Sequence, residues 1–280
     1  MNNAVTDDTR RAPETGRDTD FADRRSVLRA LVAEKNAVVL PGAPNALTAR
    51  IVEDLGFRAA YLTGAGLTNM SLGLPDLGFV TSNEVVEATA RISDVCTLPL
   101  IVDMDTGFGN ALNAYNTVRK LERAGAAAIQ IEDQVFPKRC GHTPGREDIP
   151  MAEKVAKIRV APDTRQSPDF LIVARTDAAA VAGLDAALER AVRLAEDGAD
   201  IVFVEAPRSR ADLARVAAAL PGRWLLANMV EGGATPVLPF AELSALGFRL
   251  VIFPGGIVRA LARTAADYYR TLVGEGSTAA

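Results

Sequence analysis

Short apolar runs alternate with longer amphipathic segments along most of the chain. Eight runs rich in Val, Ile, Leu and Ala indicate strands, and they cover residues 38–40, 59–62, 98–103, 128–132, 170–174, 201–204, 224–227 and 249–253. After each run, apolar positions recur at helical spacing. The predicted helices cover residues 21–34, ahead of the first strand, and then 46–55, 82–95, 111–124, 151–161, 183–197, 210–219, 239–246 and 257–272.

This alternation predicts the fold class. Continuous apolar strands are typical of a parallel sheet that helices cover. Eight strand–helix units in about 240 residues match the count and size of a TIM (β/α)8 barrel. A doubly wound α/β sheet is the alternative, although it rarely uses eight equal units. We therefore expect one catalytic barrel over residues 21–280 and a disordered tail over the polar residues 1–20.

Composition narrows the class of protein. The 280-residue chain has a net charge of −4 and no basic stripe, so nucleic acid is not an expected partner. No apolar run reaches the length that spans a bilayer, and the first residues do not form a signal peptide. Two cysteines provide no disulfide framework, so a reducing cytoplasm is the expected compartment.

Two carboxylates end the strand predicted over residues 98–103. Asp103 and Asp105 are two residues apart, so both side chains leave the same face of an extended backbone. Carboxylates this close repel each other unless a cation lies between them, and hard oxygen ligands suit Mg²⁺ or Mn²⁺. Solvated loop aspartates or a helix cap are the alternative. Glu132 ends the next strand and favours the prediction of a metal site.

Polar or ionisable residues end nearly every predicted strand. A TIM barrel builds its active site at the carboxyl ends of its strands. Unpaired buried charges are costly, so a purely structural barrel has no reason to gather them on one rim. The candidate residues on this rim are Tyr61, Thr63, Asp103, Asp105, Glu132, Arg175, Glu205, Asn228 and the turn at Pro254 and Gly255.

Two features of this rim suggest that it recognises carboxylates. Arg175 could clamp a substrate carboxylate with two N–H groups. The alternative is an ion pair with Glu132 or Glu205, and both interactions can hold at once. The N–H groups of residues 63–66 could hold a carboxylate or phosphate, although any tight turn uses glycine.

A long connection follows the fourth predicted strand. Residues 134–148 exceed the length of a plain strand-to-helix turn, which is typical of a lid over a site. Within it Cys140 lies among Lys138, Arg139 and His142, and positive neighbours favour a thiolate. Cys140 could therefore donate a proton to a carbanion, or it could be incidental to a solvated basic turn. His142 could contact an anion or donate a structural hydrogen bond.

Seven motifs bring these residues together: Tyr61-Leu-Thr-Gly64, Leu74-Pro-Asp-Leu-Gly78, Asp103-Met-Asp-Thr-Gly-Phe-Gly109, Ile131-Glu-Asp-Gln134, Lys138-Arg-Cys-Gly-His142, Ala174-Arg-Thr-Asp177 and Val204-Glu-Ala-Pro207. Together they resemble the isocitrate lyase/phosphoenolpyruvate mutase superfamily, over about residues 25–275. The lid motif is similar to that of the lyase branch.

The resemblance implies roles for individual residues. Mg²⁺ would be held by Asp103, Asp105 and Glu132, partly through water, and Cys140 would be the proton donor. The implied substrate contacts are Tyr61, Thr63, Gly64, Ala65, Asp76, Arg139, Gly141, His142, Arg175, Glu205 and Asn228. The resemblance also implies a homodimer or homotetramer whose subunits exchange the last helix of the barrel.

The implied activity is a Mg²⁺-dependent carbon–carbon lyase. It would cleave a 2-hydroxy di- or tricarboxylate of the alkylmalate or methylisocitrate type to a 2-oxo acid, such as pyruvate, and a carboxylate. Tyr61 and metal-activated groups are the candidate bases. The alternatives are carboxyphosphonoenolpyruvate mutase-type P–C chemistry, oxaloacetate decarboxylation, or a non-catalytic dicarboxylate-binding barrel.

Two positions bear on the choice of substrate. Members of the superfamily that take methylisocitrate usually carry hydroxyl side chains near the ends of strands seven and eight, where this chain has Val230 and Gly255. A third carboxylate would lack donors there, and an unpaired buried carboxylate is costly. We therefore expect alkylmalates to be better substrates than methylisocitrate.

Overall fold

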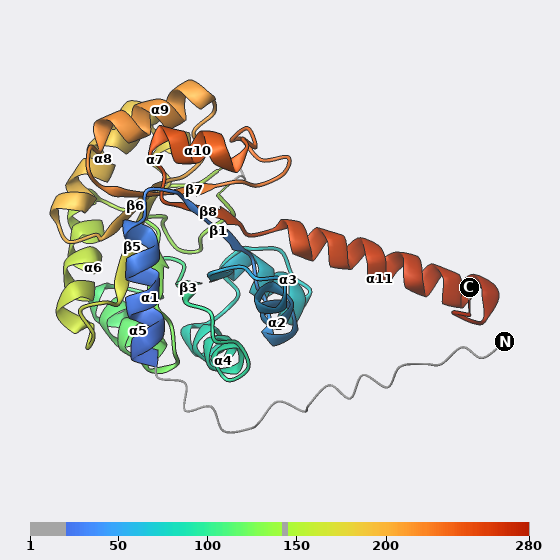
Figure 1. Cartoon of the computed structure of the whole chain (residues 1–280). Helices are drawn as coiled ribbons and strands as arrows, with labels where there is room; N and C mark the ends of the chain where they lie inside the picture. Colours follow the sequence, from blue (N-terminus) through green and yellow to red (C-terminus); the bar gives the residue numbers. More distant parts are fainter. Residues whose placement is uncertain (1–20, 142–144, 280) are drawn as a thin grey trace.

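Eight parallel strands form the centre of the molecule in the computed structural model, and helices surround them (Figure 1). The structure describes residues 21–141 and 145–279, so the tail predicted for residues 1–20 and the role predicted for His142 lie outside the described residues. The strands are β1 (Val38–Pro41), β2 (Ala60–Leu62), β3 (Leu100–Asp103), β4 (Ala128–Ile131), β5 (Leu171–Thr176), β6 (Ile201–Val204), β7 (Trp224–Asn228) and β8 (Leu250–Phe253).

The strands follow one another around a barrel. From β2 to β8 each strand pairs in parallel with the next one in the sequence, and β8 also pairs with β1. A bridge between Gly42 and Tyr61 joins the two ends of the sheet, so the barrel is nearly closed. The predicted TIM barrel is confirmed.

The predicted helices are present, with their ends shifted by a few residues, and the structure adds α3 and α7. The helices are α1 (Phe21–Ala33), α2 (Ala46–Asp54), α3 (Gly64–Leu72), α4 (Ser82–Ser93), α5 (Ala111–Arg123), α6 (Met151–Thr164), α7 (Ala178–Val181), α8 (Leu184–Glu196), α9 (Arg210–Ala219), α10 (Phe240–Leu246) and α11 (Gly256–Glu275). The sequence predicted a turn where α3 begins. Thr63 caps this helix, because its Oγ1 accepts a hydrogen bond from Gly66 N at 3.2 Å.

Two apolar layers hold the barrel together. The inner layer fills the barrel and includes Leu40, Ile101 and Phe203, which are fully buried. The outer layer lies between the strands and the helices and includes Val102 and Ile129. The two-residue period of a strand separates the layers. The same period turns alternate side chains at the carboxyl ends of the strands toward the barrel axis.

α1 closes the amino-terminal end of the barrel. Its residues Leu28 and Val32 are fully buried in the inner layer. Arg29 lies 3.0 Å from Asp169, shortly before β5, and Arg25 donates a 2.7 Å hydrogen bond to the carbonyl of Glu122, shortly before β4. Burying one leucine side chain stabilises the fold by about 1.5–3 kcal/mol. This end therefore serves stability, and the carboxyl end is left for chemistry.

α11 projects away from the barrel (Figure 1). None of its residues is classed as buried, and Tyr269 and Val273 are 62% and 87% exposed. Apolar side chains exposed along a helix of 20 residues form a surface that association would bury. Despite this length, no helix in the described ranges is apolar enough to cross a bilayer.

Candidate active site

A pocket of about 410 Å³ opens at the carboxyl ends of the strands. Its lining contains residues that the sequence predicted to form the site and others that it did not predict. The predicted residues that line it are Tyr61, Thr63, Ala65, Asp76, Asp103, Glu132, Arg139, Cys140, Gly141, Arg175, Glu205, Asn228, Pro254 and Gly255. Gly64 and Asp105 contact Asp103 at the edge of this set.

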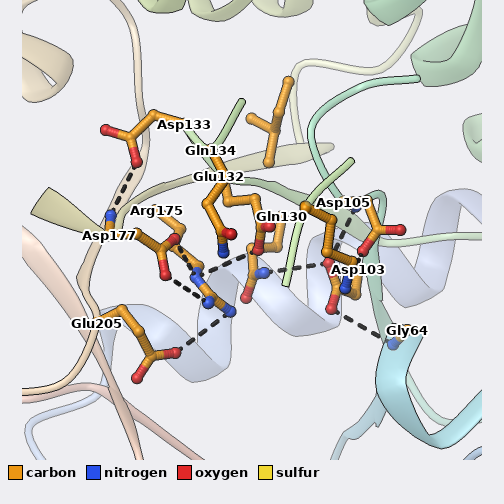
Figure 2. Close-up of polar contacts among 12 residues, drawn as sticks. Gly64, Asp103, Asp105, Gln130, Glu132, Asp133, Gln134, Arg175, Asp177 and Glu205 are labelled. Atoms are coloured by element: carbon orange, nitrogen blue, oxygen red, sulfur yellow. Dashed lines mark hydrogen bonds and ion pairs between the residues drawn. The ribbon is translucent and has the colours of Figure 1, made fainter. Parts of the chain in front are cut away.

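Asp103 is held by three donors. Its Oδ1 accepts hydrogen bonds from Gln130 Nε2 at 3.2 Å and from Asp105 N at 3.1 Å, and its Oδ2 accepts one from Gly64 N at 3.4 Å (Figure 2). Gln130 Oε1 in turn accepts the hydroxyl of Tyr61 at 2.8 Å. Asp103 is therefore fixed in orientation rather than free to rotate.

Asp105 follows β3 in a left-handed backbone conformation, with φ 50°. Its Oδ1 lies 2.7 Å from Lys138 Nζ, which also lies 2.5 Å from Asp76 Oδ1. Burial raises the pKa of Asp105 to about 6, although the Lys138 ammonium opposes this shift. The carbonyl of Asp105 accepts Glu132 N at 2.9 Å, so the two chain segments that carry these carboxylates are joined.

Arg175 forms the second charged group of the site. Its Nε and Nη2 each donate to a carboxylate oxygen of Asp177 at 2.9 Å, while Nε lies 3.4 Å from Glu132 and Nη1 lies 3.3 Å from Glu205 (Figure 2). Burial opposes the charge, but these carboxylates hold the pKa of Arg175 well above its usual range. The guanidinium stacks 5.2 Å from the ring centroid of Phe203. The ion pairs considered as the alternative role of Arg175 are therefore present.

The oxygen donors at this end of the pocket fit a hard divalent cation. Glu132 Oε1 is buried and has no hydrogen-bond partner within the part of the chain that the structure describes. A Cβ placed on Gly64 would lie 3.2 Å from Asp103 Oδ2 and from Asp105 Oδ1, so both oxygens face the same small space. Among residues 21–141 and 145–279, no three His, Cys, Asp or Glu side chains are arranged so that they could hold a metal ion by themselves. A cation such as Mg²⁺, which keeps several waters, needs no such arrangement.

Cys140 is half-buried on the lid and lines the pocket. The side chain of Gln134 holds the loop before it, donating to Arg139 O at 2.9 Å and accepting Arg139 N at 3.0 Å. At Gly141 the backbone comes so close that a Cβ would lie 2.4 Å from Arg175 Nη2. The lid therefore packs directly on the guanidinium.

The other residues of the site have separate positions. Asn228 Nδ2 donates to Glu205 Oε2 at 3.0 Å, which links β7 to β6. The opposite side of the pocket combines residues that the sequence identified, Val230 and Pro254, with residues that it did not identify, Ile252, Val258 and Arg259.

Gln130 and Asp177 were missed as site residues. Both have a signal in the sequence. Gln130 is a lone amide within the apolar run 128–131 of β4, and such a residue needs buried partners. Asp177 follows Arg175 by two residues at a strand end, a spacing that permits an ion pair on one face.

The chain is similar in sequence to proteins of one known family. A family model described as phosphoenolpyruvate phosphomutase matches residues 28–273. The chain is 46% identical over 252 residues to 2,3-dimethylmalate lyase of Eubacterium barkeri, covering 90% of this chain and 87% of that one. It is 44% identical over 250 residues to 2-methylisocitrate lyase of Escherichia coli strain K12, covering 89% and 84%.

Solved structures show the same likeness. A crystal structure of 2,3-dimethylmalate lyase superposes with a TM-score of 0.88 at 35% identity, covering 91% of this chain and 86% of that chain. Oxaloacetate acetylhydrolase in complex with 3,3-difluorooxalacetate superposes with a TM-score of 0.88 at 34% identity, covering 94% and 89%.

Proposed function

Because the chain belongs to the phosphoenolpyruvate phosphomutase family, we propose that its pocket cleaves the C2–C3 bond of a 2-hydroxy dicarboxylate of the alkylmalate type. The reaction class predicted from the sequence, a carbon–carbon lyase acting on 2-hydroxy di- or tricarboxylates, is confirmed by the named lyases among its relatives. One observation supports the proposed cleavage most directly: buried carboxylates, Arg175 and the lid cysteine line the same pocket.

Binding begins with the carboxylate next to the 2-hydroxyl. The Nε–Nη2 edge of Arg175 is taken by Asp177, and Nη1 lies 3.3 Å from Glu205, so the remaining N–H of Nη1 and the second N–H of Nη2 would bind substrate. The ion pairs with Glu132 and Glu205 keep the guanidinium charged and in place. Its position is set before substrate arrives, which reduces the entropy lost on binding.

The carboxylates Asp103, Asp105 and Glu132 would hold the divalent cation, Mg²⁺ by donor chemistry and Mn²⁺ as the alternative. When bound, the cation supplies positive charge next to the oxygens on which negative charge develops. Asp103 and Glu132 are 7% and 1% exposed, and electrostatic stabilisation is strong where water is excluded.

Cleavage requires two proton movements. The 2-hydroxyl loses its proton to a base at the charged end of the pocket. Tyr61 lines the pocket there, but burial raises the pKa of its hydroxyl well above the usual range, so Tyr61 accepts a hydrogen bond from the 2-hydroxyl rather than its proton. The C2–C3 bond breaks, C2 becomes a carbonyl carbon, and the electron pair stays on C3. The thiol of Cys140 then donates its proton to C3 and becomes a thiolate, so that a 2-oxo acid and a carboxylate leave.

We also propose that subunits exchange α11. The exposed apolar residues of this helix support the proposal, and α2 exposes a matching stripe at Leu47, Ile51 and Leu55, which are 69%, 47% and 71% exposed. Light scattering tests it: the chain should have the mass of a dimer or tetramer, and Tyr269→Glu with Val273→Glu should lower that mass. A monomeric wild-type chain would contradict the exchange.

Turnover of several acids tests the proposed function. We expect 2,3-dimethylmalate to have a higher kcat/KM than methylisocitrate or isocitrate, and we expect a chelator to stop the reaction. Reduction of the 2-oxo acid by a coupled dehydrogenase gives the rate. A clear preference for methylisocitrate would contradict the alkylmalate assignment, and turnover in excess chelator would contradict the metal site.

A further inference from the structure

Gln130 is a polar residue in the interior of an apolar strand. Its neighbours Ile129 and Ile131 belong to the outer apolar layer, so Gln130 faces the inside of the barrel. Its side chain has no exposure to solvent. A buried amide left without hydrogen-bond partners destabilises the fold, so the position of Gln130 requires a compensating interaction.

That interaction is a chain of two hydrogen bonds. Asp103 and Gln130 are register partners on the adjacent strands β3 and β4, so their side chains leave the same face of the sheet. Gln130 Nε2 donates to Asp103 Oδ1 at 3.2 Å, and Gln130 Oε1 accepts the Tyr61 hydroxyl at 2.8 Å. Three strands, β2 to β4, thus contribute one residue each.

The carboxylate at one end determines the polarity of the whole chain. An ionised carboxylate only accepts hydrogen bonds, so the amide nitrogen of Gln130 must face Asp103. The amide oxygen then faces Tyr61, and the phenol must donate its proton to it. Tyr61 therefore presents its lone pairs to the pocket, where it can accept a hydrogen bond from a substrate hydroxyl.

The same contact determines which oxygen of Asp103 is available. Oδ1 accepts both Gln130 Nε2 and Asp105 N, whereas the one hydrogen bond found for Oδ2 among the described residues is the 3.4 Å contact with Gly64 N. Oδ2 also faces the small space beside Gly64 that Asp105 Oδ1 faces. The hydrogen bonds on Oδ1 leave Oδ2 as the oxygen for the cation.

We propose that Gln130 is a positioning residue that joins Tyr61 and Asp103 into one unit, orienting the phenol toward substrate and Asp103 Oδ2 toward the cation. The proposal rests on the function proposed above. Residues that support a metal ligand in this way typically contribute 10–100-fold to metal affinity or activity.

Two variants and one control test the proposal through metal affinity. Gln130→Leu keeps the approximate volume of the side chain but removes its hydrogen-bond donor and acceptor. The variant should bind Mn²⁺ about 10-fold more weakly or worse, as measured by calorimetry without substrate. Gln130→His has one ring donor and one ring acceptor and should recover most of the affinity. Thr89→Val also removes a fully buried polar group, one that does not line the pocket, and should leave Mn²⁺ affinity unchanged.

Kinetics add a second readout. Gln130→Leu should lower kcat more than it changes KM, because the substrate clamp at Arg175 is untouched. Tyr61→Phe should add little to Gln130→Leu in the double variant, since both changes break the same chain of hydrogen bonds. If Gln130→Leu fails to fold, Gln130→Asn replaces it in the test. Its side chain is one methylene shorter, so it should not reach both Tyr61 and Asp103 and should also weaken Mn²⁺ binding.

The outcomes separate the two proposals. Wild-type Mn²⁺ affinity in a folded Gln130→Leu or Gln130→Asn protein would overturn the role of Gln130 and leave the lyase function standing. Equal losses in Gln130→Leu and Gln130→His would show that size rather than hydrogen-bond polarity matters, which also overturns it. A wild-type protein that binds neither Mn²⁺ nor Mg²⁺ would overturn the metal site, and this proposal with it.

Discussion

The two sides of the pocket are built differently. The side formed by β3 to β6 presents buried carboxylates and a guanidinium, joined by ion pairs of 2.9–3.4 Å around Arg175. The side formed by β7, β8 and α11 presents apolar residues, among them Val230, Ile252 and Val258. Its charged residue, Arg259, forms an ion pair with Glu231.

Glycines on the two sides differ in the same way. A Cβ on Gly141, at the charged side, would lie 2.4 Å from Arg175 Nη2 and 2.9 Å from Glu205. A Cβ on Gly255, at the apolar side, would have Arg259 Nη1 as its nearest neighbour, at 3.7 Å. The charged side is therefore packed to a fixed geometry and the apolar side has spare room. We infer that the first performs the chemistry and the second selects the substituent of the substrate.

Removing a carboxylate from the charged side should have the largest effect. Asp105→Ala removes a proposed cation ligand and should lower kcat by about 10³-fold or more, a loss of several kcal/mol in transition-state stabilisation. The fold should survive, because burial raises the pKa of Asp105 to about 6 and because Lys138, which loses its ion pair with Asp105, keeps the one with Asp76. Steady-state rates with saturating Mg²⁺, together with the Tm, measure both effects. A variant that keeps near wild-type kcat would contradict the site.

Cys140→Ser should have the next largest effect. A serine hydroxyl is a much weaker acid than a thiol, so protonation of C3 should slow and kcat should fall by about 10²-fold or more. Substrate affinity should change little, because Arg175 and the carboxylates remain. Calorimetric titration with oxalate, a small dicarboxylate, provides the binding control. Cleavage at the wild-type rate would make Cys140 an ordinary lid residue.

Matched glycine variants compare the two sides directly. Gly141→Ala should move the lid away from Arg175 and lower kcat by about 10²-fold, since displacements near 1 Å at a reacting group can have that effect. Gly255→Ala should cause a much smaller loss because its Cβ meets nothing closer than 3.7 Å. The kcat values of the two variants, each measured relative to wild type, test this difference. Equal losses would contradict the inferred division of the pocket.

The apolar side should control the choice of substrate. Val230→Thr places a hydroxyl where a third carboxylate would lie and should raise kcat/KM for methylisocitrate relative to dimethylmalate by about 10-fold or more. Thr is close to Val in size, so the fold should be kept. Comparing both acids on the wild type and the variant tests this. An unchanged ratio would place substrate selection elsewhere.

The strands and the charged rim could be predicted because their signals are local. An apolar run predicts its own strand, and a polar residue directly after it must lie at the rim. α3 was missed for the opposite reason. Its first residues, Gly64, Ala65 and Gly66, are poor evidence for a helix, and Gly64 is required by neighbours distant in the sequence, such as Asp103.

Contacts between distant segments could not be read from the sequence. The hydrogen bonds from Tyr61 through Gln130 to Asp103 join residues up to 69 positions apart. The ion pair of Lys138 with Asp76 spans 62 positions. Only the register of the barrel and the path of the lid bring these groups together, and neither is encoded by a local period.

The charged side should also make stability depend on pH, and this is the smallest effect expected. Asp148, at the base of the lid, has a pKa raised to about 7 by burial and by the charge of Asp133, with Arg190 opposing the shift. Because the folded state binds this proton more tightly than the unfolded chain does, stability falls as pH rises from about 4 to 7. Asp148→Asn removes that decline.

The measured quantity is the Tm of Asp148→Asn minus the Tm of the wild type. Allowing for solvent screening, this difference should increase by about 2–4 °C between pH 4 and pH 8, corresponding to about 1 kcal/mol. Scanning calorimetry at several pH values measures it, with the exposed Glu147→Gln as control. A Tm difference that is the same at pH 4 and pH 8 would show that Asp148 titrates alike in the folded and unfolded chains.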